Sequence, residues 1–357
     1  MLFDNRIQKL KESLNKLNLE AIIIAKPENV MYLTGFKGGS GLAVITLNNN
    51  HIITDARYTE QAKLEAVGFE IIDQKSNLSK TLKTILEKEA IQEVGFESDF
   101  ITYHQFIEWN EIITPIKLKA TNGIVENLRQ FKDKREIVSL KKAAQIADAA
   151  FEYILKLLKP GVSERDVANE LEYYMKQHGS EKPAFETIIV SGYRSSLPHG
   201  VPSTKKIENG DFITLDFGAV YDGYHSDMTR TVVVGKASQE QKKLYNTVLE
   251  AQLRSLYAVR EGLSCQEVDM IARDYLKEAG YCKEFGHNLG HGIGLAIHEE
   301  PRLSPKSNIL LAAGMAVTIE PGVYIEGFGG VRIEDSIIVT STGFEVLTNS
   351  TKKLIEL

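Results

Sequence analysis

An internal repeat is the feature of this chain that most restricts its fold. The segments GVSERDVANELEYYMKQHG (161–179) and GLSCQEVDMIARDYLKEAG (262–280) match at an offset of 101 residues. Each copy has a Ser followed three residues later by an acid, then a helical pattern and a closing Gly, which is typical of a helix with a capping box. Two copies are too few for a solenoid. The sequence therefore predicts a domain of two similar halves, each packing a helix against a sheet.

The repeat continues into a pattern of acidic residues. DFGAVYDG (216–223) and EPGVYIEG (320–327) align, and each follows an apolar run that indicates a strand. Asp227 comes after the first segment and Glu334 after the second, so each half offers one carboxylate on a strand and one on the strand's return. If the halves face each other, four carboxylates meet in one cleft. Like charges at close range raise one another's pKa, so such a cluster predicts bound divalent cations.

A glycine-rich segment supplies imidazole groups for the same site. EFGHNLGHGIGLAIHEEP (284–301) carries His287, His291 and His298 among four glycines. So many glycines argue against a helical two-histidine zinc motif and favour extended backbone. Oxygen ligands with a single imidazole suit Mn²⁺, Co²⁺, Fe²⁺ or Zn²⁺. The sequence therefore predicts a shared site for two divalent ions about 3.5 to 4 Å apart.

The first third of the chain has a different rhythm. Helical patterns near 4–18, 58–67 and 78–90 alternate with short apolar runs such as EAIIIAKP and GLAVITL, which predicts a small α/β domain. A charged stretch follows, with the composition of a linker, and leads into a long helical pattern that stops at Pro160-Gly161. We expect an N-terminal domain over residues 1–125, a linker over 126–135 and a second domain over 136–357.

Composition and charge exclude several classes of protein. Of the 357 residues 43% are hydrophobic and 25% charged, and the formal net charge is −6 without a basic arm, so no nucleic-acid partner is expected. The N-terminus lacks the apolar region of a signal peptide, and no apolar run approaches the ~20 residues of a membrane span. We expect a cytoplasmic protein with no membrane partner. Cys265 and Cys282 show no disulfide or metal-site spacing and are expected in the core.

The acidic residues and one histidine carry a resemblance to a known family. Asp216, Asp227, His291, Glu320 and Glu334, in the contexts DFG, SDMTR, GHGIGL, EPG and RIED, resemble the ligands of the metal-dependent peptidases with the pita-bread fold. The chain is most similar to the proline-specific branch, the Xaa-Pro dipeptidases (prolidases) and Xaa-Pro aminopeptidases. VMYLTGF and TDARYTEQA resemble that branch's N-terminal domain. The resemblance implies an α+β fold, in which a creatinase-type α/β domain precedes a pseudo-two-fold pita-bread catalytic domain.

The resemblance also implies a role for each of these five residues. Asp216 would bind one metal ion, His291 and Glu320 the other, and Asp227 and Glu334 would bridge the two. Water activated between the ions would attack the peptide carbonyl. Glu320 would also accept the proton of that water and help deliver it to the leaving nitrogen. The cofactors implied are two divalent metal ions, Mn²⁺ first, with Co²⁺, Zn²⁺ and Fe²⁺ as alternatives.

Further residues match positions around the substrate cleft of that branch. Three histidines resemble groups that donate hydrogen bonds to the attacked carbonyl or the product, and two other residues lie beside the metal carboxylates. The predicted catalytic residues are Glu320, His199 and His298. The predicted substrate-binding residues are His287, Tyr324, Arg332 and Arg302.

The family pattern also bears on Arg302, Thr229 and Arg194. Arg302 lies where some prolidases use an arginine to hold a free C-terminal carboxylate, and a bidentate contact of that kind would select dipeptides. Thr229 is expected to hydrogen-bond the metal-site carboxylates from behind. Arg194 departs from the family pattern, because many relatives have Asn there, and the role of that loop stays open.

These observations predict a two-metal exopeptidase that hydrolyses the Xaa-Pro bond, first of all in dipeptides. Its partner would be a small peptide substrate with proline in the second position, and the family suggests a homodimer. An Xaa-Pro aminopeptidase acting on longer peptides is the alternative, followed by a non-catalytic peptide- or protein-binding module. The creatinase reaction does not use this metal set, and methionine aminopeptidases usually lack a preceding domain of this kind.

Overall fold

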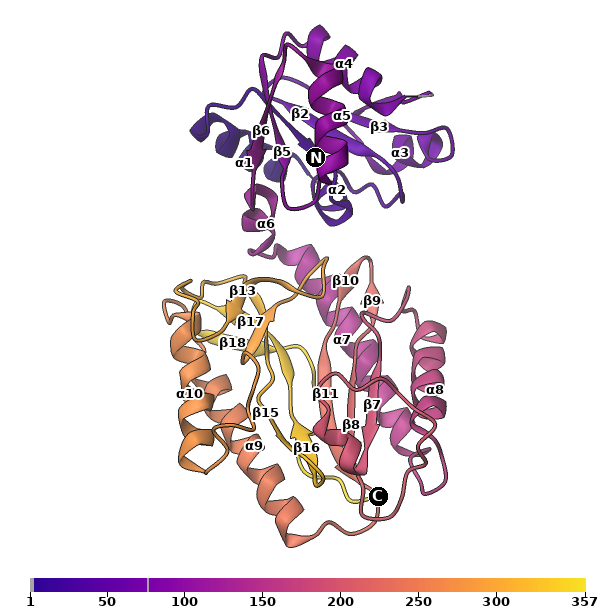
Figure 1. Cartoon of the computed structure of the whole chain (residues 1–357), viewed down its shortest axis with the longest axis vertical. Coiled ribbons are helices and arrows are strands. Elements are labelled where there is room, and N and C mark those ends of the chain that lie inside the picture. The colour runs from indigo at the N-terminus through magenta and orange to yellow at the C-terminus, as the bar shows by residue number, and fades with distance from the viewer. Residues whose placement is uncertain (1–2, 76) are drawn as a thin grey trace. The chain divides into compact units, whose positions relative to one another are not determined.

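The computed structural model of the chain describes residues 3–75 and 77–357, and the chain divides into two compact units between Arg129 and Gln130 (Figure 1). The segment 126–135, expected as a linker, is divided between them. Its first residues belong to helix α6 (Ile124–Arg129) of the first unit, where Glu126 accepts a hydrogen bond of 2.7 Å from Asn29. The boundaries 1–125 and 136–357 stay a prediction of where the two domains begin and end.

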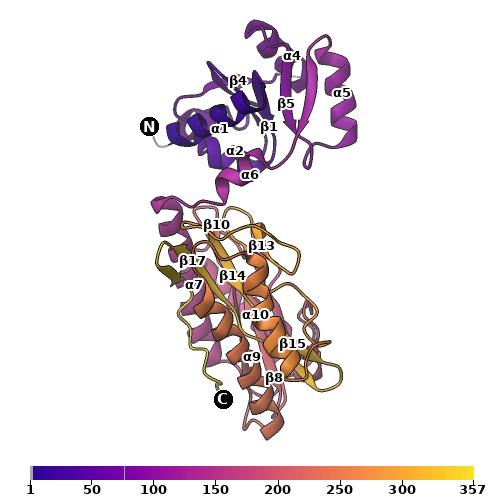
Figure 2. The same cartoon turned by 90° about the vertical axis from the view of Figure 1, so that its left-hand side faces the viewer.

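The first unit is a six-stranded mixed sheet with the strand order β4-β3-β2-β1-β5-β6. Strands β1, β2 and β3 pair antiparallel, and the other neighbours pair parallel. Helices α4 and α5 pack on one face through Leu82, Leu86 and Trp109, and Figure 2 shows α1 on the opposite side of the sheet from α5. Both faces are covered, which explains continuous apolar strands such as AIII at β1.

The strands of this unit are β1 (Ala21–Ile24), β2 (Leu42–Thr46), β3 (Asn50–Thr54), β4 (Glu70–Asp73), β5 (Glu93–Glu97) and β6 (Lys117–Thr121). Its other helices are α1 (Asp4–Lys16), α2 (Pro27–Thr34), α3 (Thr59–Glu65), α4 (Leu78–Lys88) and α5 (Tyr103–Ile113). The helical patterns near 4–18, 58–67 and 78–90 are therefore confirmed, each a little shorter than expected.

The second unit consists of two halves of similar design. In the first half, helices α7 and α8 pack against a sheet of order β11-β8-β7. In the second half, helices α9 and α10 pack against a sheet of order β13-β12-β14-β17-β18. Figure 1 shows the two sheets between the two pairs of helices.

The first half contains α7 (Lys134–Leu155), α8 (Glu164–Gln177), β7 (Ile188–Ser191), the 3₁₀ helix η1 (Gly192–Ser196), β8 (Phe212–Phe217), β9 (Val220–Tyr221), β10 (Tyr224–His225) and β11 (Met228–Val233). The second half contains α9 (Gln239–Ala258), α10 (Cys265–Glu278), β12 (Gly290–Gly292), β13 (Glu299–Leu303), β14 (Ala316–Ile319), β15 (Gly322–Ile325), β16 (Gly329–Arg332), β17 (Asp335–Thr340) and β18 (Gly343–Val346).

The repeated segments form the matching helices α8 and α10. Ser163 and Asp166 make a capping box at the start of α8, and Ser264 and Glu267 make the same box at the start of α10. Both capping serines also form an isolated β-bridge with a later segment of their own half. The prediction of two halves that each pack a helix against a sheet is confirmed.

Strand pairing explains how each half presents two carboxylates. β8 pairs antiparallel with β11, and β14 pairs antiparallel with β17. Asp216 lies near the end of β8 and Asp227 directly before β11, while Glu320 directly follows β14 and Glu334 directly precedes β17. The end of one strand and the beginning of its antiparallel partner lie side by side, so the two acids of each half are brought together.

The two cysteines and the helices test expectations about the core and about membrane spans. Cys265 is buried as expected, but Cys282 is exposed. The expectation for Cys282 was wrong because this residue lies beyond Gly280, where the chain has left α10 and turns at the surface. Within residues 3–75 and 77–357, no helix has the length and apolar character needed to cross a membrane.

Candidate metal centre

The five predicted metal ligands meet where the strands of the second unit end. One ligand atom each from Asp227, His291 and Glu334 lie within 4.8 Å of one another. His291 Nε2 lies 3.3 Å from Glu320 Oε1 and 3.5 Å from Asp227 Oδ2. Asp216 is close enough to Asp227 for its charge to raise the pKa of that carboxyl group, after the larger effect of burial. The sequence order of these residues thus corresponds to one cluster in space.

Two oxygen atoms of this cluster require a partner that the protein does not provide. Among the residues that the structure describes, Asp216 Oδ1 and Glu334 Oε1 are buried and have no hydrogen-bond partner. Leaving a buried acceptor without a partner costs about 1–3 kcal/mol, more if it is charged. Four carboxylates and one imidazole are a donor set that suits borderline divalent cations. The residues present therefore fit a divalent metal site.

Burial and mutual repulsion raise the pKa values of these acids. The pKa of Asp227 lies well above its ordinary value because of burial, followed by the charges of Asp216 and Glu320. The pKa of Glu334 is raised in the same way, by burial first and then by Asp227 and Glu320. Burial also raises the pKa of Glu320, against the opposing charge of His291. In the absence of a cation, ionised carboxylates therefore destabilise the folded protein at neutral pH.

A short chain of hydrogen bonds orients two of these carboxylates, those of Asp216 and Glu334. Arg332 donates from Nη2 to Asp216 Oδ2 (2.6 Å) and from Nε to Thr229 Oγ1 (3.1 Å). Thr229 in turn donates to Glu334 Oε2 at 2.7 Å, and it is fully buried. The expectation that Thr229 supports the metal-site carboxylates by hydrogen bonding is confirmed. Because these contacts fix one oxygen of Asp216 and one of Glu334, the second oxygen of each is left for a ligand.

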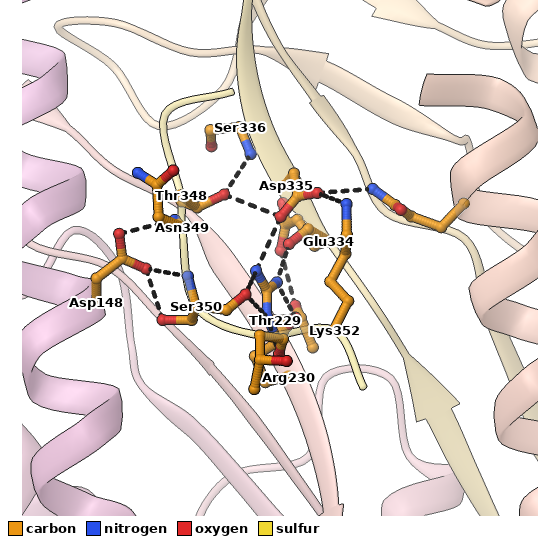
Figure 3. A network of polar contacts seen from close by, with 12 residues as sticks. Asp148, Thr229, Arg230, Glu334, Asp335, Ser336, Thr348, Asn349, Ser350 and Lys352 are labelled. Carbon is orange, nitrogen blue, oxygen red and sulfur yellow. Dashed lines mark hydrogen bonds and ion pairs between the residues drawn. The ribbon is translucent and has the colours of Figure 1, made fainter. Parts of the chain in front are cut away.

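A second network fixes the main chain behind the same acids (Figure 3). Buried Asp335 accepts from Arg230 Nη2 at 2.8 Å and also pairs with Lys352 of the C-terminal segment. Arg230 additionally donates to the carbonyl oxygen of Glu334, and Ser336 Oγ donates to the carbonyl oxygen of Asp227 at 2.8 Å. The C-terminal segment thus takes part in holding both carboxylate-bearing loops in place.

A cavity of about 460 Å³ opens over the cluster and receives side chains from both halves. It is lined by four of the five predicted ligands, all except Glu334, and by all of the other predicted site residues. The latter are His199, His287, His298, Arg302, Tyr324 and Arg332.

Two of these histidines have a strongly lowered pKa. The pKa of His287 falls to about 4, mainly because of burial and then because of the positive charge of Arg332. The pKa of His298 also falls to about 4, because of desolvation and then because of His291, whose ring lies edge-on at 4.4 Å between centroids. Both rings are therefore neutral at pH 7 with one N–H each, and His287 donates its own from Nδ1 to the carbonyl oxygen of Asn288 at 2.8 Å. His287 Nε2 lies 3.0 Å from the hydroxyl of Tyr324, which accepts from Arg332 Nη1 at 2.8 Å.

The cavity has an apolar wall that the sequence analysis did not identify. Phe185, Ile188 and Ile297 line it. Apolar residues in strands and loops are common, so nothing in their pattern distinguishes a cavity wall from a core. The position of Ile297 beside His298 was the only available signal.

Comparison with known proteins identifies the family. A model of metallopeptidase family M24 matches residues 138–341, and a model of the creatinase/prolidase N-terminal domain matches residues 6–131. This chain belongs to metallopeptidase family M24. The family, the α+β fold with a creatinase-type domain before the catalytic domain, and the assignment as a metallopeptidase are thus confirmed.

Relatives of this M24 peptidase are similar over their full length. An Xaa-Pro dipeptidase of Pyrococcus furiosus is 40% identical over 98% of this chain and 99% of its own. Among solved structures, an Xaa-Pro dipeptidase from Bacillus anthracis is 48% identical with a TM-score of 0.97, covering 99% of both chains. An X-Pro aminopeptidase from Thermotoga maritima is 35% identical with a TM-score of 0.91, covering 97% of this chain and 100% of that one.

The repulsion within the cluster predicts an unusual effect of Asp227→Asn. Because the raised pKa of Asp227 means that its ionised form opposes folding, the substitution should stabilise the metal-free protein at pH 7 by about 1 kcal/mol or more. The gain should shrink as the pH falls below the raised pKa of Asp227 in the folded protein, and it should vanish near pH 4, where the carboxyl group of the unfolded chain is protonated as well. Thermal unfolding of both proteins in excess chelator measures this difference.

The matched control is Asp148→Asn. Asp148 accepts backbone hydrogen bonds from Asn349 and Ser350, both at 2.8 Å, so neutralising it should give no stabilisation. An Asp227→Asn protein that is less stable than the wild type in chelator at pH 7 would contradict the electrostatic account.

Proposed function

We propose that this M24 metallopeptidase hydrolyses the Xaa-Pro bond of dipeptides, the prolidase reaction. The observation that carries the proposal is the composition of a single cavity, which holds the carboxylate–imidazole cluster together with the cationic side chain of Arg302. A cavity of about 460 Å³ suits a small peptide. The Xaa-Pro dipeptidases among the full-length relatives support the same activity.

The five clustered residues are proposed to hold two divalent metal ions. Asp216 would hold one ion, His291 and Glu320 would hold the other, and Asp227 and Glu334 would contribute to both. Mn²⁺ is the first choice, with Co²⁺, Zn²⁺ and Fe²⁺ as alternatives, because oxygen-rich sites with one imidazole admit all four. Ions at such a site supply Lewis acidity, which lowers the pKa of water and polarises a carbonyl group.

Three side chains are proposed to handle protons and developing charge. Glu320 accepts the proton of the attacking water and delivers it to the proline nitrogen, which can leave only as a protonated amine. His199 and His298 donate hydrogen bonds toward the oxygen of the attacked carbonyl group, where negative charge develops. The neutral state of His298 leaves it one N–H for this purpose.

The remaining side chains are proposed to select and hold the substrate. Arg302 binds the C-terminal carboxylate of a dipeptide. His287, Tyr324 and Arg332 bind the polar groups of the substrate that lie beside the metal ions. Proline has no backbone N–H, so its ring can lie against an apolar wall without leaving a donor unpaired. The apolar wall of the cavity described above offers such a surface.

We also propose a cytoplasmic homodimer whose partner is a small peptide with proline in the second position, with neither nucleic acid nor membrane as a partner. The second candidate activity is that of an Xaa-Pro aminopeptidase on longer peptides, which the Thermotoga maritima relative favours. A non-catalytic peptide- or protein-binding module is the third, and the intact set of five clustered side chains argues against it.

Removal of metal tests whether the cluster is the catalytic centre. Chelator-treated protein should lose hydrolysis of Ala-Pro, because the carboxylates alone offer no Lewis acid, and should regain it with Mn²⁺ or Co²⁺. Release of proline measures the activity, and metal analysis of the same samples measures occupancy. Undiminished turnover in fully metal-free protein would refute the proposal.

Arg302→Ala separates the dipeptidase from the aminopeptidase. The free carboxylate that Arg302 would bind lies on proline itself only in a dipeptide, so the variant should lose about tenfold more kcat/KM on Ala-Pro than on Ala-Pro-Ala. Arg302→Lys serves as the matched control, because it keeps the positive charge but loses the bidentate contact. Its kcat/KM on Ala-Pro should lie between those of the wild type and Arg302→Ala. Equal losses on both substrates would remove the argument for a dipeptidase.

A further inference from the structure

The loop that carries His199, residues 191–203, is fastened at both ends to one buried carboxylate. Glu164, the first residue of α8, is fully buried. At one end of the loop, it accepts hydrogen bonds from Ser191 N (2.7 Å) and Ser191 Oγ (3.0 Å). At the other end, it accepts from Ser203 N (3.0 Å) and Ser203 Oγ (2.6 Å). A single side chain therefore closes the loop at its base.

Arg194, the fourth residue of the loop, links this base to Val201 near the other end of the loop. Its Nε donates to both oxygens of Glu164, at 3.0 and 3.3 Å, and its Nη2 donates to the carbonyl oxygen of Val201 at 2.8 Å. The side chain is 20% exposed, so the ion pair is largely removed from water. Val201 lies two residues beyond His199 and Arg194 five residues before it. The guanidinium thus spans the part of the loop that presents the histidine.

The loop also contacts strand β16, which carries Gly330 and Arg332. Ser195 Oγ accepts from Gly330 N at 2.8 Å and donates to the carbonyl oxygen of Gly192 at 2.6 Å. Arg332 Nη1 donates to the carbonyl oxygen of Pro198 at 3.2 Å. The residue before His199 is therefore tied to the arginine that also binds Asp216. Any shift of the loop moves His199 relative to the metal-site carboxylates.

Comparison of the two halves shows that Glu164 is specific to this loop. At the offset of 101 residues, its counterpart in the second half is Cys265, which is buried and uncharged. The second half needs no anchor of this kind, because strand pairing of Gly290 with Leu303 and of Gly292 with Glu299 closes its corresponding loop. A buried carboxylate is thus not required by the helix–sheet packing that the halves share.

We propose that Glu164 and Arg194 are positioning residues that hold His199 over the metal-site carboxylates. The inference rests on the proposed function, in which His199 donates to the substrate carbonyl. It also assigns a role to Arg194, which departs from the family pattern. Removal of Arg194 leaves Glu164 with four hydrogen-bond donors from Ser191 and Ser203, so its charge remains solvated by the protein and the fold should persist.

A double-mutant cycle tests the proposal. With metal-loaded protein and Ala-Pro, His199→Ala should lower kcat about 100-fold through loss of a hydrogen bond to the reacting carbonyl. Arg194→Ala should lower kcat about tenfold through misplacement of that group. In the His199→Ala background, Arg194→Ala should cost less than about threefold, because there is no longer a group to misplace.

Controls distinguish positioning from a general loss of structure. Lys206→Ala removes a cation near the start of the same helix, where Lys206 Nζ lies 3.8 Å from exposed Asp166, and should leave kcat within about twofold. Metal content and melting temperature are measured for every variant. Arg194→Met, which keeps most of the side chain's volume, is run in parallel so that the cycle stands even if Arg194→Ala does not fold.

The kcat values of the four proteins in the cycle, together with their metal contents, decide whether Arg194 positions His199. A tenfold loss from Arg194→Ala in both backgrounds, or a loss that follows metal content, would overturn the positioning role. Coupling between the two sites with unchanged metal content supports it. Metal-loaded wild-type protein that does not cleave Ala-Pro would instead contradict the proposed function, and the inference with it.

Discussion

The repulsion between buried carboxylates is the interaction on which the catalytic unit depends. Burial and the neighbouring acids raise the pKa values of Asp227 and Glu334 well above their ordinary values. An arrangement of this kind opposes folding unless positive charge is supplied. Arg332 supplies part of it through its contact with Asp216, but two buried carboxylate oxygens still have no partner among the described residues. A divalent cation satisfies both the charge and the unpaired oxygens.

The fold brings these acids together by using one design twice. Each half pairs the end of one strand with the beginning of its antiparallel partner, and each thereby contributes two acids. The hydrogen bond from Thr229 to Glu334 then joins a residue of the first half to one of the second. Asp335 also forms ion pairs with Arg230 from the first half and with Lys352 from the C-terminal segment. The position of each acid thus depends on segments far apart in the sequence.

The sequence predicted the parts of the structure that depend on local pattern or on the chemistry of single residues. The capping boxes at Ser163 and Ser264 are visible as short motifs. The acids of the cluster are conspicuous because carboxylates are unusual beside apolar strands. What it did not predict depends on tertiary packing. Glu164 reads as an ordinary acid in the first turn of a helix, and only the fold shows that it is buried against both ends of a loop. Phe185 likewise looks like any core residue until the cavity is seen.

The central claim is that the five side chains of this cluster hold two divalent ions between the halves of the catalytic unit. Anomalous diffraction from crystals grown with Mn²⁺ measures this most directly. The account predicts two peaks about 3.5 to 4 Å apart, with Asp227 and Glu334 in contact with both. Crystals that contain Mn²⁺ only at other positions, with these carboxylates protonated and paired to one another, would contradict it.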